Sequence, residues 1–231
     1  MRFFALLLAL LLPSLAQSQD DGGESRQVVC RFLCFGSTDT PDAVDTIGPK
    51  GAKIPCPLPT KRISEPITAY AKANKIAFYQ ENSDKLAGTA TIPSNARAAI
   101  LVFVPAPEGA KSKAPWRVIV IEDSAKNFPD GGIFVANFHN DDIRFIIGEH
   151  KGALHPARTK GYARPEKRDS FNMAPVIFEF LSQDKWRVGN ESALRFLPGM
   201  RYLIFAYTDP RSKRPRINTY QDFRSVAKPL P

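Results

Sequence analysis

The chain has 231 residues, of which 43% are hydrophobic, and its 32 Lys and Arg against 23 Asp and Glu give a net charge of +9. A chain of this length can bury a core without crosslinks, and no run after residue 18 is apolar enough to span a bilayer. The positive charge favours acidic partners such as envelope phosphates, acidic glycans or nucleic acid.

The first eighteen residues have the pattern of a secretion signal. Arg2 supplies the positive start, an unbroken apolar run follows over residues 3–12, and small residues stand at Ala16 and Ser18. The run stops at Pro13, short of the roughly 20 apolar residues that a membrane span needs. We therefore expect cleavage after Ala16 or Ser18 and a mature protein that is periplasmic or extracellular.

Residues 19–61 are expected to form an irregular N-terminal segment rich in proline and cysteine. Within it, Gln27–Phe35 is apolar enough for a first strand or a buried segment. The Pro-Cys-Pro-Leu-Pro stretch at 55–59 cannot be helical, because proline lacks a backbone donor and restricts the residue before it. We expect a loop or an edge crossing there.

The chain has three cysteines, Cys30, Cys34 and Cys56. In an oxidising compartment they could form one disulfide. Cys30 and Cys34 would share a face of a strand, so either could reach Cys56, and we take Cys34 and Cys56 as the candidate pair. Free buried thiols and a three-thiolate metal site are the alternatives. No cofactor is expected.

From residue 62 to 223, short runs rich in Val, Ile, Phe and Tyr recur about every ten residues. This spacing is typical of a β-sandwich or barrel, and no stretch of fifteen residues has the apolar stripe of a helix. We predict one all-β domain without internal repeats, an antiparallel β-sandwich of Ig-like or jelly-roll-like type. The expected strands are Lys75–Gln80, Gly88–Ile92, Arg97–Val104, Trp116–Glu122, Gly132–Phe138, Asp142–Gly148, Tyr162–Arg164, Pro175–Leu181, Lys185–Val188 and Met200–Tyr207.

Four of the apolar runs carry apolar residues on both faces: Ala98–Val104, Val118–Ile121, Ile133–Phe138 and Tyr202–Tyr207. A strand of this kind is usually buried on both sides. We therefore expect cover on each face, either because the sheet is tightly sandwiched or because the N-terminal segment packs across its outer face.

Basic residues cluster near the C-terminus, in front of an extended tail at 224–231. The cluster consists of Arg211, Lys213, Arg214 and Arg216. A secretion signal excludes a nuclear address, so we predict an anion-binding role, with a solvated charged hairpin as the alternative. A second basic loop spans 158–169. If both loops lie at one end of the sandwich, they would form one positive face.

Few residues are placed for catalysis. His139, His150 and His155 lie in adjoining predicted hairpins, where two of them could meet across strands. The G-x-S-x-G motif of hydrolases is absent, and no glycine-rich loop has the strand–helix context of a phosphate site. No cysteine follows Cys56, which disfavours a blue-copper site. The pattern therefore favours a protein that is not an enzyme.

The order of elements from residue 97 to 223 resembles a group of exported bacterial all-β proteins of uncharacterised function. The resemblance rests on strand edges and turns, namely Ile100–Pro105, Val120–Ala125, Phe128–Asn137, Ile147-Gly148, Leu154–Pro156 and Pro198–Phe205. It implies an envelope-associated all-β domain, and no catalytic residue can be carried over from it.

The function predicted from the sequence is therefore an exported, non-catalytic binding or structural module of the cell envelope, able to bind a polyanion. Its partners would be acidic envelope polymers or another envelope protein. One alternative is a secreted hydrolase or metal-dependent enzyme that uses the histidines at 139–155. Another is a subunit of an envelope protein assembly.

Overall fold

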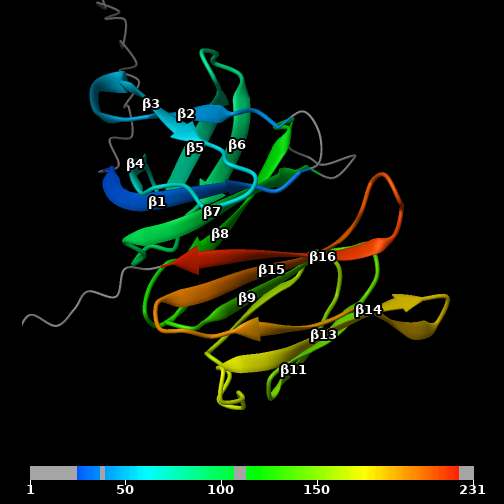
Figure 1. Ribbon diagram of the computed structural model, residues 1–231. Helices are drawn as coiled ribbons and strands as arrows, with labels where there is room; N and C mark the ends of the chain where they lie inside the picture. The colour runs from blue at the N-terminus through cyan, green and yellow to red at the C-terminus, as the bar shows by residue number, and fades with distance from the viewer. Residues whose placement is uncertain (1–24, 37–39, 107–112, 224–231) are drawn as a thin grey trace, which may run out of the picture.

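The computed structural model describes residues 25–36, 40–106 and 113–223 (Figure 1). The predicted secretion signal (1–18) and the tail (224–231) lie outside the described residues. The regular secondary structure of the described residues is sixteen strands and one 3-10 turn, so the all-β prediction is confirmed. The elements are β1 (Arg26–Cys34), β2 (Ala43–Ile47), a 3-10 turn (Pro49–Gly51), β3 (Lys53–Pro57), β4 (Ile67–Ala71), β5 (Lys75–Gln80), β6 (Leu86–Thr91), β7 (Ala98–Pro105), β8 (Trp116–Glu122), β9 (Ile133–Phe138), β10 (Ile143–Ile147), β11 (His150–Leu154), β12 (Thr159–Tyr162), β13 (Met173–Ser182), β14 (Lys185–Arg195), β15 (Met200–Thr208) and β16 (Pro215–Phe223). None of the described residues belongs to a helix that is long and apolar enough to cross a membrane.

The strands form four sheets, and the strand order is the same in the two halves of the chain. The first half has β4-β1-β7-β8 and β3-β2-β5-β6, and the second has β12-β9-β15-β16 and β11-β10-β13-β14. In each half all strand pairs are antiparallel except one, which is the middle pair of a four-stranded sheet. This parallel pair is β1–β7 in the first half and β9–β15 in the second. Where the sequence predicted one domain without repeats, the structure contains two units of one topology. We call them the N-sandwich (26–122) and the C-sandwich (133–223).

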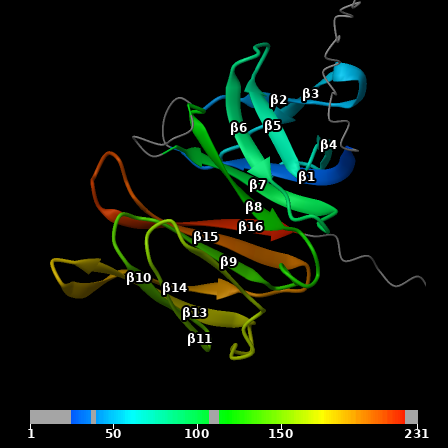
Figure 2. The ribbon, with the colours of Figure 1, turned by 180° about the vertical axis from the view of Figure 1, so that it is seen from behind.

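The four sheets stack as layers, with the N-sandwich above the C-sandwich (Figures 1 and 2). One apolar core fills the N-sandwich and includes Val28, Phe32 and Phe78, and a second fills the C-sandwich. A third core, which we call the seam, lies between the two inner sheets. The seam residues include Leu33, Ile100, Val102, Leu203 and Phe205.

The seam explains the strands that are apolar on both faces. Strand β7 is buried from Ala99 to Val104, and β15 is buried from Met200 to Ala206. Alternate side chains of each strand enter its own sandwich core or the seam. For β7 and β15 the predicted cover on each face is therefore confirmed, and the other sandwich, not the N-terminal segment, covers the second face. In β8 the residues Val118, Ile119 and Val120 are only partly buried.

The N-terminal segment differs from the irregular stretch expected between residues 19 and 61. Strand β1 is central in its sheet, between β4 and β7. The prolines of 55–57 lie in β3, which pairs only with β2 and forms an edge. Proline is tolerated on an edge strand because its missing N–H faces away from the ladder. The expected edge crossing is therefore a regular edge strand.

All three cysteines lie in the described part of the chain, where they are free, buried thiols of the N-sandwich core. The candidate Cys34–Cys56 disulfide is not formed in the structure. Cys56 is near enough to Cys30 for the two groups to interact electrostatically. Cys34 lies four residues further along β1, about 13 Å from Cys30. A disulfide needs the Cβ atoms of its two cysteines about 4 Å apart, so Cys56 cannot be within bonding distance of both Cys30 and Cys34.

Burial makes these thiols inert. It raises the pKa of Cys30 and Cys56 to about 12 and that of Cys34 to about 11. Only the thiolate is nucleophilic, so we expect no reaction with a thiol reagent near neutral pH in the folded protein. In denaturant without reductant all three should react. Because these pKa values are raised on folding, their contribution to stability is complete below about pH 8.5 and is lost as the pH rises further. A count of one thiol in denaturant would instead show a disulfide.

Candidate binding cleft

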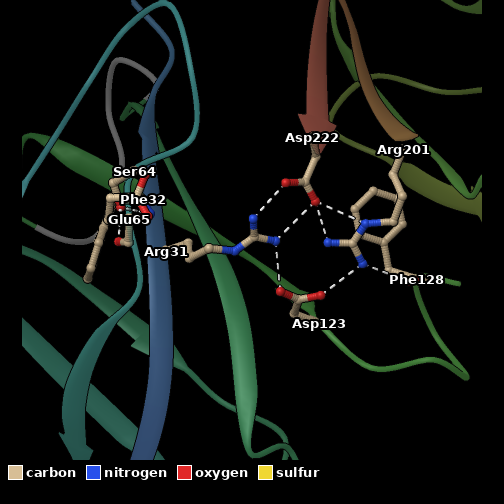
Figure 3. Close-up of polar contacts among 8 residues, drawn as sticks. All are labelled: Arg31, Phe32, Ser64, Glu65, Asp123, Phe128, Arg201 and Asp222. Atoms are coloured by element: carbon tan, nitrogen blue, oxygen red, sulfur yellow. Dashed lines mark hydrogen bonds and ion pairs between the residues drawn. The ribbon is translucent and has the colours of Figure 1, made fainter. Parts of the chain in front are cut away.

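One end of the seam is closed by four charged side chains that we call the ion lock: Arg31, Asp123, Arg201 and Asp222 (Figure 3). They come from β1, the residue after β8, β15 and β16, so the lock joins both sandwiches. Arg31 donates to Asp222 at 2.6 Å and to Asp123 at 2.8 Å. Arg201 donates from Nη1 to Asp123 at 2.8 Å and from Nε to Asp222 at 2.9 Å.

The ion lock is a structural element with no free capacity for a ligand. The Arg201 side chain is fully buried, its Nη1 also donates to the Phe128 carbonyl at 2.7 Å, and its guanidinium lies over the Phe128 ring. Burial acts to raise the pKa of Asp222, but hydrogen bonds and charge from Arg31 and Arg201 outweigh it and hold that pKa below its usual value. Two arginines and two aspartates leave the lock neutral.

At the opposite end the seam opens into a cleft of about 820 Å³. Alternate residues along β1 and just after it show where the cleft lies. Arg31 belongs to the ion lock, Leu33 packs in the seam, and Phe35 lines the cleft. Both sandwiches contribute walls, because Arg117 belongs to β8 and Arg211 to the β15–β16 turn. The volume is in the range of pockets that hold small organic ligands.

The floor of the cleft is aromatic. The partly buried rings of Phe35, Phe138 and Tyr207 form it, with centroids 5.3 Å apart for Phe35–Phe138 and 5.2 Å for Phe35–Tyr207. Tyr220 lies deeper, and its hydroxyl accepts a hydrogen bond from Asn218 at 2.9 Å. Burial, with smaller effects from Tyr207 and Cys34, raises the pKa of Tyr220. The floor is therefore uncharged at neutral pH.

Basic groups stand around this floor. Arg211 and Arg117 are both exposed and line the cleft from different sandwiches. Asp209, an acid in the wall, accepts the backbone N–H groups of Arg211 at 2.8 Å and Ser212 at 3.1 Å, and these bonds lower its pKa. Its carboxylate is thus used to hold the turn.

The predicted anion-binding cluster divides into two pairs. Arg211 lines the cleft, and Arg216 lies on the face of β16 that also carries Asn218, a lining residue. Lys213 and Arg214 are exposed on the β15–β16 turn. The sequence therefore located one side of the cleft but did not single out Arg117, Phe35 or Phe138.

The second basic loop lies elsewhere. Arg164 forms an ion pair with Asp130 and packs over Gly131. Its neighbour Tyr162 pairs with Ile133 at the start of β9, whereas the cleft is at the far end of β9. The part of this loop that follows β12 therefore lies at the other end of the sheet from the 211–216 cluster, so the two loops do not form a single positive face. Only Arg158, before β12, lies at the cleft end, next to the lining residue Ala157.

The three histidines have separate surroundings. His139 lines the cleft, with Nδ1 2.7 Å from the Thr208 hydroxyl, and burial lowers its pKa despite the opposing charge of Asp141. His150 Nε2 lies 3.0 Å from the Ala163 carbonyl, and His155 Nδ1 lies 2.8 Å from Asp142. Among the described residues no three His, Cys, Asp or Glu side chains are grouped so that they could hold a metal ion.

No protein-family model matches the chain, and no curated protein matches it.

Proposed function

We propose that the protein is an exported, non-catalytic binding module of the cell envelope that holds an anionic ligand in the cleft between its two sandwiches. The observation that carries this proposal is the cleft itself, with an aromatic floor and arginines from both sandwiches. The predicted secretion signal and the net charge of +9 agree with an acidic partner outside the cytoplasm.

The chemistry of the walls favours an anion. A guanidinium offers planar, paired donors that match carboxylate, sulfate and phosphate oxygens. Arg117 and Arg211 are exposed, and no ion pair joins either to an acid within the described residues. A ligand between them can therefore be held by donors that the fold does not otherwise use.

One observation favours a second candidate, a hydrolase centred on His139. Thr208, His139 and Asp141 follow the order hydroxyl, imidazole, carboxylate that activates a nucleophile. However, His139 Nε2 lies 3.6 Å from the Asp141 carboxylate, which is beyond hydrogen-bonding distance. Hydrolysis of activated esters that is lost in Thr208→Val, with binding intact, would favour this candidate over the binding module.

Chromatography on immobilised heparin tests the proposal. The mature protein should be retained at low salt and released at moderate salt, because exposed charges are screened within about 10 Å at 0.1 M. The variant Arg117→Glu with Arg211→Glu should elute at clearly lower salt. Arg97→Glu is the matched control, since Arg97 is an exposed arginine at the other end of the inner sheet.

Two outcomes would contradict the proposal. The first is a wild-type protein that is not retained even at low salt. The second is an Arg97→Glu variant that elutes as early as the cleft variant after allowance for its smaller change of charge. That result would mean that heparin senses only the overall charge of the protein.

A further inference from the structure

The two sandwiches correspond residue by residue as well as strand by strand. The β7–β8 hairpin closes at the pair Pro105–Trp116, and the β15–β16 hairpin closes at Thr208–Pro215. Counting back from these pairs matches Val104 with Tyr207. The β1–β7 pairing ends at Cys34–Phe103, so the next residue, Phe35, lies beside Val104. Phe138 pairs with Tyr207, the equivalent of Val104. Phe35 therefore corresponds to Phe138.

Equivalent residues meet at both ends of the seam. Phe35 and Phe138 are in contact on the cleft floor, 5.3 Å between ring centroids. At the other end Asp123 corresponds to Asp222, and both carboxylates bridge Arg31 and Arg201. Self-contact of equivalent positions is the property of a two-fold interface. The seam thus has an approximate two-fold axis that runs from the ion lock to the cleft.

The same correspondence pairs two arginines across this axis. Arg117 is the cross-strand partner of Val104, and Arg216 is the partner of Tyr207. Both are exposed. Arg117 lines the cleft, whereas Arg216 lies at its border, directly across the strand pair from the floor residue Tyr207 and on the face of β16 that carries the lining residue Asn218. Arg216 lies only at the 4.0 Å limit of an ion pair with Asp209, and its side chain is 57% exposed. The cleft therefore offers one guanidinium on each side of the axis.

We infer that the ligand is a linear acidic oligosaccharide that crosses the axis, with one carboxylate at Arg117 and another at Arg216. This inference rests on the proposed function and specifies its ligand. Two charges on one chain match two guanidinium groups better than a single small anion can. The partly buried aromatic rings of the floor give the sugar rings between the charges an apolar surface to stack on. Polar side chains on the walls, among them Thr208 and Asn218, can bond to hydroxyl groups.

Calorimetric titration with oligogalacturonates of one, two and four units tests the inference. The four-unit chain should bind at least about tenfold more tightly than the single unit, because only the longer chain can engage both guanidinium groups. Arg117→Gln and Arg216→Gln should each weaken the four-unit chain by about tenfold and change the single unit much less. Arg97→Gln is the control and should leave both affinities unchanged.

The control ligands separate the ligand classes. A neutral glucose oligomer of four units should not bind, because it lacks carboxylates. Inorganic polyphosphate and a single-stranded oligonucleotide should bind more weakly than the four-unit oligogalacturonate. Tighter binding of either would overturn the assignment to an acidic sugar and leave an anion cleft in place.

The bridging geometry and the proposed function fail in different ways. Equal affinity for one and four units, or sensitivity to only one of the two arginines, would overturn the bridging geometry but not anion binding. If no anion of the series binds at low salt, the proposed function itself fails.

Discussion

Replacing Arg201 with methionine should lower the free energy of unfolding by about 3–5 kcal/mol, which is typical of breaking a buried ion pair from one side. The Arg201 side chain is fully buried and binds Asp123, Asp222 and the Phe128 carbonyl. Without it, the buried carboxylates of Asp123 and Asp222 lose one of the two arginines of the ion lock. Urea unfolding followed by circular dichroism measures the loss.

The matched control is the same substitution at Arg144. This arginine forms an exposed ion pair with Glu179 on the outer sheet of the C-sandwich. Exposed pairs contribute little, because water and salt screen them. Arg144→Met should therefore leave the unfolding midpoint close to that of the wild type. Equal effects of the two substitutions would show that the ion lock does not hold the seam.

Replacing Phe205 with alanine should also destabilise the protein, by about 3–5 kcal/mol. The Phe205 ring is fully buried and has centroid distances of 5.3 Å to Phe35, 5.1 Å to Phe138 and 5.4 Å to Tyr220. Its removal leaves a cavity directly beneath the cleft floor. We expect weaker ligand binding as well as a lower unfolding midpoint, because Phe35 and Phe138 lose the ring that positions them.

Phe171→Ala is the control for this prediction. The Phe171 side chain is 69% exposed and lies in the loop before β13. The same deletion of a ring there should leave both stability and binding unchanged. A Phe205→Ala variant with unaltered stability would contradict the assignment of the seam as a packed core.

Much of the strand pattern could be predicted from the sequence. The predicted strands Lys75–Gln80 and Trp116–Glu122 have the bounds of β5 and β8. Two of the strands that escaped prediction contain prolines, which disfavour strand interiors. Strand β3 has two prolines, and β16 begins with Pro215. Both are edge strands, where a missing backbone donor does no harm, and only the sheet order reveals an edge.

The repeat of topology could not be predicted, because the two halves share strand register without sharing residue types. Leu33 corresponds to Ala136, and Ile119 corresponds to Asn218. The common feature is which face each position presents, and alternation alone is found in every half-buried strand. Phe35 and Phe138 are equivalent positions with the same residue type, but a single identical pair does not reveal a repeat in a sequence.

Only one wall of the cleft, the one formed by the basic cluster at 211–216, could be predicted from the sequence. The basic cluster at 211–216 is visible because its members are neighbours in sequence. Arg117 and Phe35 are separated from it by at least 94 positions and reach the cleft only through the stacking of two inner sheets. No local pattern carries that information, because the seam brings together strands from different sandwiches.

A crystal structure of the mature protein soaked with an oligogalacturonate of four units tests the central claim most directly. We predict ligand density on the floor formed by Phe35, Phe138 and Tyr207, with carboxylates at Arg117 and Arg216. Density at another surface, or an empty cleft at a concentration that saturates binding in solution, would contradict the account.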